Sequence, residues 1–350
     1  MHIAARIWRL SLGFLLVLCA ACNGSGESAG ASTDASTDAS KVYVIKFPHV
    51  TAPGTPKGQT AERFKTLAEQ RFPGRVRVEI YPSAQLMEDS EAIEALAFGE
   101  VQMIAPSLSL FDRLTPKFQV FDLPFLFKDL AAVERFQNSA AGRALLSVLE
   151  DHNILGLTFW HNGMKQLGGP RPLVHPSDAA GLKFRVMESD LLQAEIEAIG
   201  GTPQKMAFGE VYQALQTGTV DAQENTWSNI YSSKFYEVQP YITESNHGYI
   251  GYLVAVNKPF WESLPDDLRT GLEQTLAEVT EWGNARAHDI NIEDRQKIAD
   301  SGKSKIITLT PDEVAEWQAA MKPVWDEFTD SIGPDLVTAA LASSQQSSSP

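Results

Sequence analysis

The first part of the chain alternates between two hydrophobic periods, one typical of strands and the other typical of helices. Apolar and polar residues alternate over residues 76–80, residues 42–47 are rich in β-forming residues, residues 101–105 are mostly apolar, and in the helix-like stretches apolar residues recur every three or four positions. Strands are expected at residues 42–47, 76–80 and 101–105, and helices at residues 58–72 and 89–98. Because strands that alternate with helices form βαβ units, this pattern predicts an α/β fold.

A second region repeats this order of elements. It is expected to hold strands at residues 182–186 and 220–223 and helices at residues 191–199 and 210–217. A shift of 119 residues aligns seven identities: Gln85, Met87, Glu91, Ala95, Leu96, Gly99 and Val101 fall on Gln204, Met206, Glu210, Ala214, Leu215, Gly218 and Val220. Two similar lobes would produce these identities, and so would a chance likeness between two common helix–glycine–strand units.

The two regions also predict where a ligand would lie. In open α/β sheets ligands bind beyond the carboxyl ends of the strands, and here those ends are Pro106-Ser107 and Glu224-Asn225. If the two regions face each other, both ends approach one cleft. A helical pattern without proline covers residues 266–301 and would be roughly 50 Å long, so it is expected to brace both lobes.

The amino terminus has the pattern of an export signal. Arg6 and Arg9 precede a short apolar stretch, and small residues follow it, so residues 1–21 are expected to be a signal peptide. Cys22 after two alanines resembles a bacterial lipoprotein cleavage site, which predicts that Cys22 is lipidated. Ordinary cleavage after Ala21 is the alternative.

Two further segments lack the large apolar residues that a core needs. Residues 22–40 consist mainly of small and polar residues and are expected to be a flexible tether. Residues 343–350 have a similar composition and are expected to be a disordered tail. A tether that follows a lipid anchor is typical of a binding domain held near a membrane.

Composition and charge narrow the range of functions. Of the 350 residues 43% are hydrophobic and 21% are charged, which is typical of a folded soluble protein. With 29 Lys and Arg against 44 Asp and Glu the net charge is −15, and such a surface repels phosphates, so no nucleic acid is expected as a partner. An anionic ligand would need a local cationic pocket.

The sequence offers no pattern of a metal, cofactor or catalytic site. Its two cysteines, Cys19 and Cys22, lie in the amino-terminal segment, and its seven histidines lack the spacing of a metal site. No phosphate-binding glycine loop is present, and the one Gly-x-Ser-x-Gly match, at residues 26–30, falls in the tether. We therefore expect no metal, no cofactor and no enzymatic activity.

Two cations stand out in otherwise apolar surroundings. Arg185 lies inside the expected strand 182–186, where it is either a solvated residue on the outer face or a buried fork for a carboxylate. Lys165 follows an aromatic strand at a turn, where it is either solvated or directed at a ligand. Phe208 and Trp227 fit a hydrophobic core as well as a pocket wall.

Four segments around these residues have a specific pattern. They are Trp160-His161-Asn162-Gly163-Met164-Lys165, Gly181-Leu182-Lys183-Phe184-Arg185-Val186, residues 208–218, and Val220-Asp221-Ala222-Gln223-Glu224-Asn225. Together they resemble the solute-binding proteins of TRAP (tripartite ATP-independent periplasmic) transporters of the DctP type, and the first resembles the branch that binds four-carbon dicarboxylates. The resemblance covers residues 41 to about 325.

The resemblance implies a role for each matching residue. Arg185 matches an arginine that clamps the substrate carboxylate through two parallel hydrogen bonds, and Asn225 matches an asparagine that holds the same carboxylate or orients the arginine. Lys165 matches a second cation at the other end of a dicarboxylate, and Phe208 matches a residue that lines the cleft. Further ligand contacts with weaker support are implied at His49, Ser107, Gln85 and Trp227.

The resemblance also implies the architecture. The expected fold is the two-lobe periplasmic-binding-protein fold (Venus flytrap), with the long helix bracing both lobes. Lobe I is expected to comprise residues 41–162 and 251–290, and lobe II residues 163–250 and 291–342.

The function implied is the capture of a small organic acid, such as succinate, fumarate or malate, by lobe closure. The receptor would deliver this acid to membrane permease subunits from the periplasm, held to a membrane through Cys22. A TRAP receptor for a sugar acid, such as a uronate or an aldonate, is the alternative within the family. A sensor subunit that presents its ligand to a membrane kinase, or a carboxylate-acting enzyme on the same fold, is the alternative of a different class.

Overall fold

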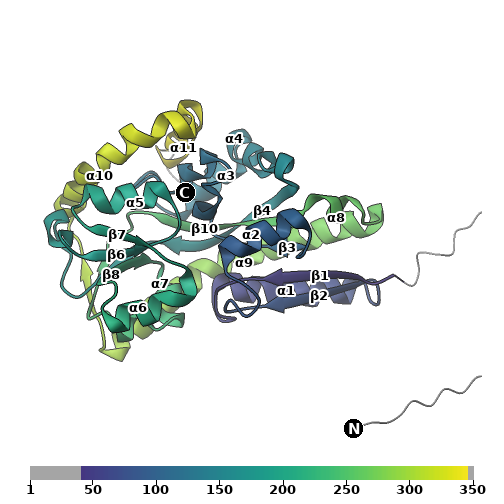
Figure 1. Ribbon diagram of the computed structural model, residues 1–350, viewed down its shortest axis with the longest axis horizontal. Coiled ribbons are helices and arrows are strands. Elements are labelled where there is room, and N and C mark those ends of the chain that lie inside the picture. Colours follow the sequence, from purple (N-terminus) through teal and green to yellow (C-terminus); the bar gives the residue numbers. More distant parts are fainter. Residues whose placement is uncertain (1–40, 346–350) are drawn as a thin grey trace, which may run out of the picture. The chain divides into compact units, whose positions relative to one another are not determined.

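The computed structural model describes residues 41–345, which form a mixed α/β protein with two lobes (Figure 1). The expected signal peptide (residues 1–21), Cys22 and the rest of the tether (residues 23–40) lie outside the described residues, as do residues 346–350. In the part that is described, none of the helices combines the length and the apolar character that crossing a membrane requires.

Five strands form the first lobe, in two adjoining sheets: β1 (Tyr43–Pro48), β2 (Val76–Tyr81), β3 (Met103–Ile104), β4 (Ile154–Met164) and β10 (Tyr249–Asn257). β1 pairs in parallel with β2, and β10 pairs antiparallel with β3 and β4. Helix α1 (Pro56–Arg71) connects β1 to β2, and α2 (Asp89–Phe98) leads to β3. The apolar face of α1 packs on the strands and buries Phe47, Phe64 and Trp160 in one core.

Six strands form one sheet in the second lobe: β5 (Gln166–Gly169), β6 (Lys183–Val186), β7 (Thr202–Lys205), β8 (Ala222–Asn225), β9 (Tyr241–Glu244) and β11 (Lys305–Thr308). Their order is β11-β9-β5-β8-β6-β7, and β6 lies parallel to both of its neighbours. The connecting helices are α5 (Asp190–Ala198), α6 (Val211–Thr217) and α7 (Trp227–Ser232). The α/β class predicted from the two periods is thus confirmed in both lobes.

Two neighbouring segments carry the chain between the sheets of the two lobes. β4 ends at Met164 and β5 begins at Gln166, so Lys165 is the first crossing, and residues 245–248 between β9 and β10 are the second. The crossings lie side by side, because the backbone N–H of Lys165 donates a hydrogen bond to the carbonyl oxygen of Gly248 at 2.8 Å. Together they form the hinge between the lobes.

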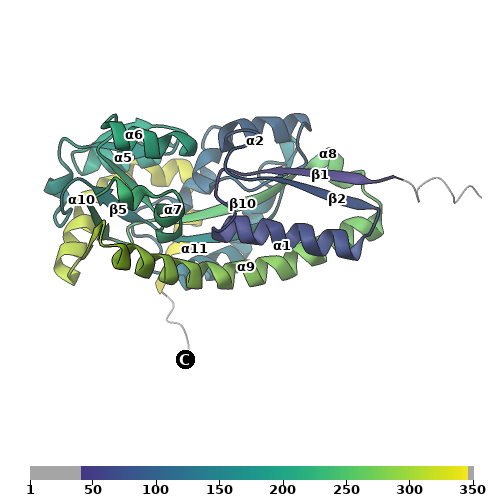
Figure 2. The ribbon, with the colours of Figure 1, turned by 90° about the horizontal axis from the view of Figure 1, so that it is seen from below.

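Helix α9 (Asp266–Ser301) is a third link and has 36 residues. It packs against α1 in the first lobe and against α7 in the second, and Figure 2 shows it running beneath both. The predicted bounds of this helix and its bracing position are confirmed. α1 and α9 approach closely where Gly283 faces Thr60, because no side chain separates the two helices there.

Five further α-helices lie in the described part: α3 (Leu130–Asn138), α4 (Ala140–Ala144), α8 (Lys258–Glu262), α10 (Pro311–Ile332) and α11 (Pro334–Gln345). α10 packs on α5, and α11 turns back to pack on α3. The expected tail from residue 343 is wrong for its first three residues, because α11 buries Val337, Ala340 and Ser343 and continues to Gln345. Residues up to 342, which include most of α11, were assigned to lobe II, but α11 contacts α3, which lies in the range assigned to lobe I. The lobe bounds stay a prediction.

The two regions related by the 119-residue shift have the same local geometry. Gly99 directly follows α2 and Gly218 directly follows α6, and both glycines are left-handed, with φ of 80° and 73°. Glycine adopts this conformation without the steric cost that a Cβ would add. Each helix is then followed by a strand, β3 or β8, whose carboxyl end reaches the cleft between the lobes.

We expect Gly283→Val to weaken the contact between α1 and α9. A Cβ at this position would lie 2.4 Å from Thr60 Oγ1 and 2.6 Å from Thr60 Cγ2, and overpacking of this kind costs about 1–3 kcal/mol. Urea denaturation should show that loss in the free energy of unfolding. Gly54→Val is the control, because no atom lies within 4 Å of the Cβ it would add. Equal stability of the two variants would contradict the packing described.

Candidate functional site

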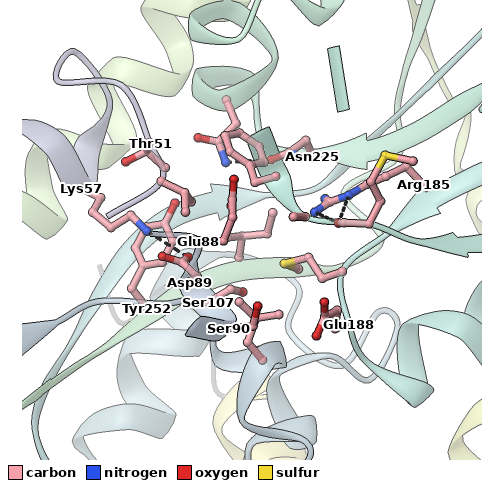
Figure 3. Close-up of a pocket in the computed structure, with 18 residues that line it drawn as sticks. Thr51, Lys57, Glu88, Asp89, Ser90, Ser107, Arg185, Glu188, Asn225 and Tyr252 are labelled. Carbon is pink, nitrogen blue, oxygen red and sulfur yellow. Dashed lines mark hydrogen bonds and ion pairs between the residues drawn. The ribbon is translucent and has the colours of Figure 1, made fainter. Parts of the chain in front are cut away.

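The cleft between the lobes holds a cavity of about 50 Å³, with walls from both lobes (Figure 3). Ser107, just after β3, and Asn225, at the end of β8, both line it, as the position of the strand ends predicted. Arg185 and Phe208 line it as well. Four of the eight residues expected to contact a ligand are therefore brought together in one pocket.

Arg185 enters the pocket from β6 and is only 3% exposed. Its Nε and Nη2 donate hydrogen bonds to the carbonyl oxygen of Met206 at 3.0 and 2.8 Å, and the Phe208 ring centre lies 6.0 Å from the guanidinium carbon. Burial lowers the pKa of Arg185 to about 10, so the group stays cationic at neutral pH. Among the described residues no carboxylate forms an ion pair with it, although a buried charge normally has such a partner.

Asn225 lies beside Arg185 with a fixed orientation. Its side-chain oxygen accepts hydrogen bonds from the backbone N–H of Thr226 at 3.0 Å and from Nδ2 of Asn229 at 2.8 Å. Both bonds use the oxygen, so the amide NH₂ group is left to donate. A guanidinium and an amide that both donate into one buried space are suited to a carboxylate.

Lys57 is a second cation of the pocket, on the side opposite Arg185 (Figure 3). It is fully buried at the start of α1. Its Nζ donates a hydrogen bond to the carbonyl oxygen of Ala105 at 2.9 Å, lies 3.5 Å from Asp89 Oδ2, and lies 4.0 Å from the centre of the Tyr252 ring. Burial lowers the pKa of Lys57, and the nearby Asp89 opposes that shift.

The sequence reasoning missed Lys57 and Asp89, although both could have been found from helical spacing. Lys57 precedes Ala61 by four residues and Phe64 by seven, so it falls on the apolar face of α1. Asp89 falls in the same way on the face of α2 that buries Ile93. A charged residue on the apolar face of a helix is the pattern that would have indicated a buried polar site.

Contacts across the cleft hold the two lobes together. Glu88, which precedes α2, accepts a hydrogen bond from the backbone N–H of Gly209 in the second lobe. Arg113 Nη2, from the segment after β3, lies 3.3 Å from Glu188 Oε2. Gly209 leaves room for this contact, because a Cβ there would lie 2.5 Å from Glu88 Oε1. The lobes are therefore in a closed arrangement.

The structure places Lys165 at the hinge and outside this pocket, which corrects its expected position at the far end of a ligand. Lys165 is fully buried, and its Nζ lies 2.7 Å from Glu224 Oε2. Its charge is paired inside the protein, so the geometry gives it no role as a ligand contact.

Three other expected contacts also lie outside the pocket. His49 is buried behind it, where its Nδ1 lies 3.3 Å from Thr51 Oγ1 and burial lowers its pKa to about 3. Gln85 is exposed to solvent. Trp227 faces a different cavity, and its ring centre lies 5.5 Å from the guanidinium carbon of Arg295.

The hinge itself contains a buried cluster of charged and titratable side chains. Glu224 Oε2 lies 3.2 Å from His247 Nε2 as well as next to Lys165, and Glu195 Oε1 lies 3.7 Å from the same His247 nitrogen. Burial alone would raise the pKa of Glu224, but Lys165 and His247 together hold it below its usual value. Burial raises the pKa of nearby Asp122 from 3.8 to about 7, although Lys165 opposes the shift.

Comparisons with known proteins identify the family. Within residues 41–345 no three or more His, Cys, Asp or Glu side chains are grouped so that they could hold a metal ion. The family described as bacterial extracellular solute-binding protein, family 7 (DctP) matches residues 47–331. The chain belongs to this family. The matched residues include strands of both lobes and the pocket-lining Arg185 and Asn225. The predicted resemblance to TRAP solute-binding proteins and the predicted two-lobe fold are confirmed.

Individual relatives are similar over most of the chain. A C4-dicarboxylate-binding periplasmic protein, DctP, from Shewanella loihica is 51% identical over 301 residues, which cover 86% of this chain and 90% of the relative. A TRAP periplasmic solute-binding protein from Shewanella oneidensis, solved with bound succinate, has a TM-score of 0.86 and 51% identity and covers 87% of this chain and 100% of its own. One from Pseudomonas aeruginosa, solved with bound L-malate, has a TM-score of 0.80 and 46% identity, with coverage of 81% and 99%.

We expect Gly209→Ala to weaken ligand binding by opening the cleft. The added Cβ pushes Glu88 away from the Gly209 N–H, and loss of a hydrogen bond to a charged group costs about 1.5 kcal/mol or more, so the affinity should fall roughly tenfold. Calorimetric titration with succinate, the ligand of the Shewanella oneidensis relative, measures this change.

Glu88→Asp supplies the compensating variant for this test. Its shorter side chain makes room for the Cβ, so the double variant should recover part of the affinity that Gly209→Ala alone loses. An unchanged affinity in Gly209→Ala would contradict the role assigned to this contact.

We also expect Asp122 to make stability depend on pH. The pKa of Asp122 is about 7 in the folded protein, whereas its ordinary value, which applies to the unfolded chain, is 3.8. At a pH between these two values the folded state therefore holds a proton that the unfolded state has lost. The stability due to this proton is complete below about pH 4 and is lost as the pH rises through about 7. Relative to wild type, Asp122→Asn should therefore gain up to about 1.4 kcal/mol per pH unit across that window.

Urea denaturation at several pH values between these limits measures the gain. Asp330→Asn, which removes an exposed carboxylate from α10, provides the baseline. A stability difference between Asp122→Asn and wild type that is the same at every pH would contradict the assignment.

Proposed function

We propose that this protein is a TRAP receptor that binds a four-carbon dicarboxylate such as succinate, fumarate or malate. The observation that carries the proposal is the buried Arg185, a cation with no carboxylate partner among the described residues, inside a closed cleft. The carboxylate of a ligand would be that partner. Donors that remain on Nη1 and Nη2 of Arg185 can meet both carboxylate oxygens, and the Asn225 amide adds a further donor.

The size of the cavity supports a short acid over a sugar acid. A cavity of about 50 Å³ has room for roughly four water molecules. A four-carbon chain with a carboxylate at each end is closer to this size than a longer acid is. A six-carbon sugar acid is larger and brings several hydroxyl groups, each of which loses binding free energy unless it finds a partner.

The relatives support the same substrate class. The protein from Shewanella loihica is named for C4-dicarboxylate binding, and the solved structures from Shewanella oneidensis and Pseudomonas aeruginosa hold succinate and L-malate. Each of the three is at least 46% identical to this chain. Arg185 and Asn225 lie within the segment that the family matches.

Binding and closure are one process in this proposal. A ligand that contacts Arg185 in the second lobe and Ser107 in the first has its full set of partners only when the lobes are closed. It therefore stabilises the closed arrangement over the open one by the difference in its affinity for the two. The two crossings at the hinge and α9 connect the lobes and limit the directions in which they can move relative to each other.

The proposal includes delivery of the bound acid, chemically unchanged, to the membrane permease subunits of a TRAP transporter. The relatives named above are periplasmic proteins, which supports the same location for this chain. The sequence pattern around Cys22 supports a lipid anchor there, with residues 23–40 as the tether between the membrane and the lobes.

We expect Arg185→Met to lose binding without losing the fold. Loss of one side of a desolvated charge pair costs about 2–5 kcal/mol, which lowers the affinity roughly 30-fold to several thousand-fold. The ligand-free protein should be at least as stable as wild type, because a buried cation without a carboxylate partner costs free energy that methionine does not. Calorimetry with succinate and thermal denaturation without ligand measure the two effects.

Two variants serve as controls. Arg185→Lys keeps a positive charge but lacks the planar fork, so it should also lose most of the affinity. Lys183→Met, at the exposed start of the same strand, should bind as wild type does. Near-native affinity in Arg185→Met would contradict the proposed function.

A further inference from the structure

Lys57 occupies a position that is unfavourable for a cation unless an anion approaches it. It is the second residue of α1, where the unpaired N–H groups of the helix already carry partial positive charge. It is also fully buried, and burial lowers its pKa. A lysine in such a place normally has a close carboxylate partner.

The nearest carboxylate compensates this charge only in part. Asp89 Oδ2 lies 3.5 Å from Lys57 Nζ, beyond the length of about 2.7–2.9 Å that a strong charged hydrogen bond has. Asp89 already accepts hydrogen bonds from the backbone N–H groups of Ser107 and Val50, and it is the first residue of α2. The negative charge of the Asp89 carboxylate is therefore already stabilised by backbone N–H groups and by the start of α2.

The donors of Lys57 lead to the same conclusion. Of the three N–H bonds of the ammonium group, one is directed at the carbonyl oxygen of Ala105 at 2.9 Å, and the Tyr252 ring covers a second side at 4.0 Å. The third side faces Asp89 Oδ2 at 3.5 Å and the pocket that Lys57 lines, so an anion that lies closer in the pocket would compete with Asp89 for this donor.

The other acids of the pocket do not pair with its cations. Glu88 accepts the hydrogen bond from Gly209, and Glu188 pairs with Arg113. Of the described residues that line the pocket, Lys57 and Arg185 are the only Lys or Arg, and they stand on opposite sides of it (Figure 3). A short chain with a carboxylate at each end would give both of them a partner at once.

We propose that Lys57 binds the second carboxylate of the ligand and is the residue by which the receptor distinguishes dicarboxylates from monocarboxylates. The inference rests on the proposed function and deepens it, since it names the group that recognises the far end of the acid. It assigns to Lys57 the role that sequence reasoning had assigned to Lys165. Arg185 then selects for an acid, and Lys57 selects for the second acid group.

The test compares succinate with succinamate, in which an amide replaces one carboxylate, by calorimetry on the full chain. Wild type should bind succinate at least roughly 30-fold more tightly than succinamate, because the amide leaves Lys57 with only the partial compensation that Asp89 provides. In Lys57→Met the two ligands should bind within about threefold of each other, mainly because succinate binding falls. Lys46→Met, which replaces an exposed side chain of β1, is the control and should keep the wild-type ratio.

A second variant keeps the test valid if Lys57→Met does not fold. Lys57→Met with Asp89→Asn removes both members of the pair, so that no unpaired charge is left buried, and it should show the same loss of discrimination. If wild type binds no four-carbon dicarboxylate, the proposed function fails and this inference fails with it. If wild type binds succinate but the folded Lys57 variants keep its preference over succinamate, only this inference is overturned.

Discussion

A buried guanidinium without a carboxylate beside it is the constraint on which the rest of this structure depends. Arg185 has the Met206 carbonyl and the Phe208 ring as partners, and neither carries a full negative charge. Taking a cation out of water in this way costs free energy that an anionic ligand can recover. The closed cleft is therefore more stable with an organic acid than without one, so the same group accounts for recognition and for closure.

Most of the fold could be predicted because its elements have regular patterns and clear ends. The helical pattern continues without interruption from Asp266 to Ser301, and it predicted both ends of α9. Gly99 and Gly218 indicated where α2 and α6, the two helices related by the 119-residue shift, end. The tail was predicted to begin at residue 343 because Ser343 and its neighbours are small and polar. Their burial depends on packing against α3, a contact over a long sequence distance that composition does not reveal.

In the candidate site, only the residues that strand ends or family motifs indicate could be predicted from the sequence. Ser107 and Asn225 were placed at the cleft because they lie at or just after strand ends whose direction follows from the βα pattern, whereas Arg185 was assigned to the ligand by the family resemblance. Lys165 lies one residue beyond a strand end, where the hinge turns its side chain to Glu224, and no local pattern predicts that turn. Lys57 was overlooked because the predicted helix began at residue 58, one residue after it, and only its register with Ala61 and Phe64 indicated burial.

A crystal structure of the wild-type protein with bound succinate tests the central claim most directly. The account predicts one carboxylate against the guanidinium of Arg185 and the amide of Asn225, with the other carboxylate against Nζ of Lys57. A structure in which succinate binds elsewhere, while Arg185 keeps only the Met206 carbonyl as a hydrogen-bond partner, would contradict it.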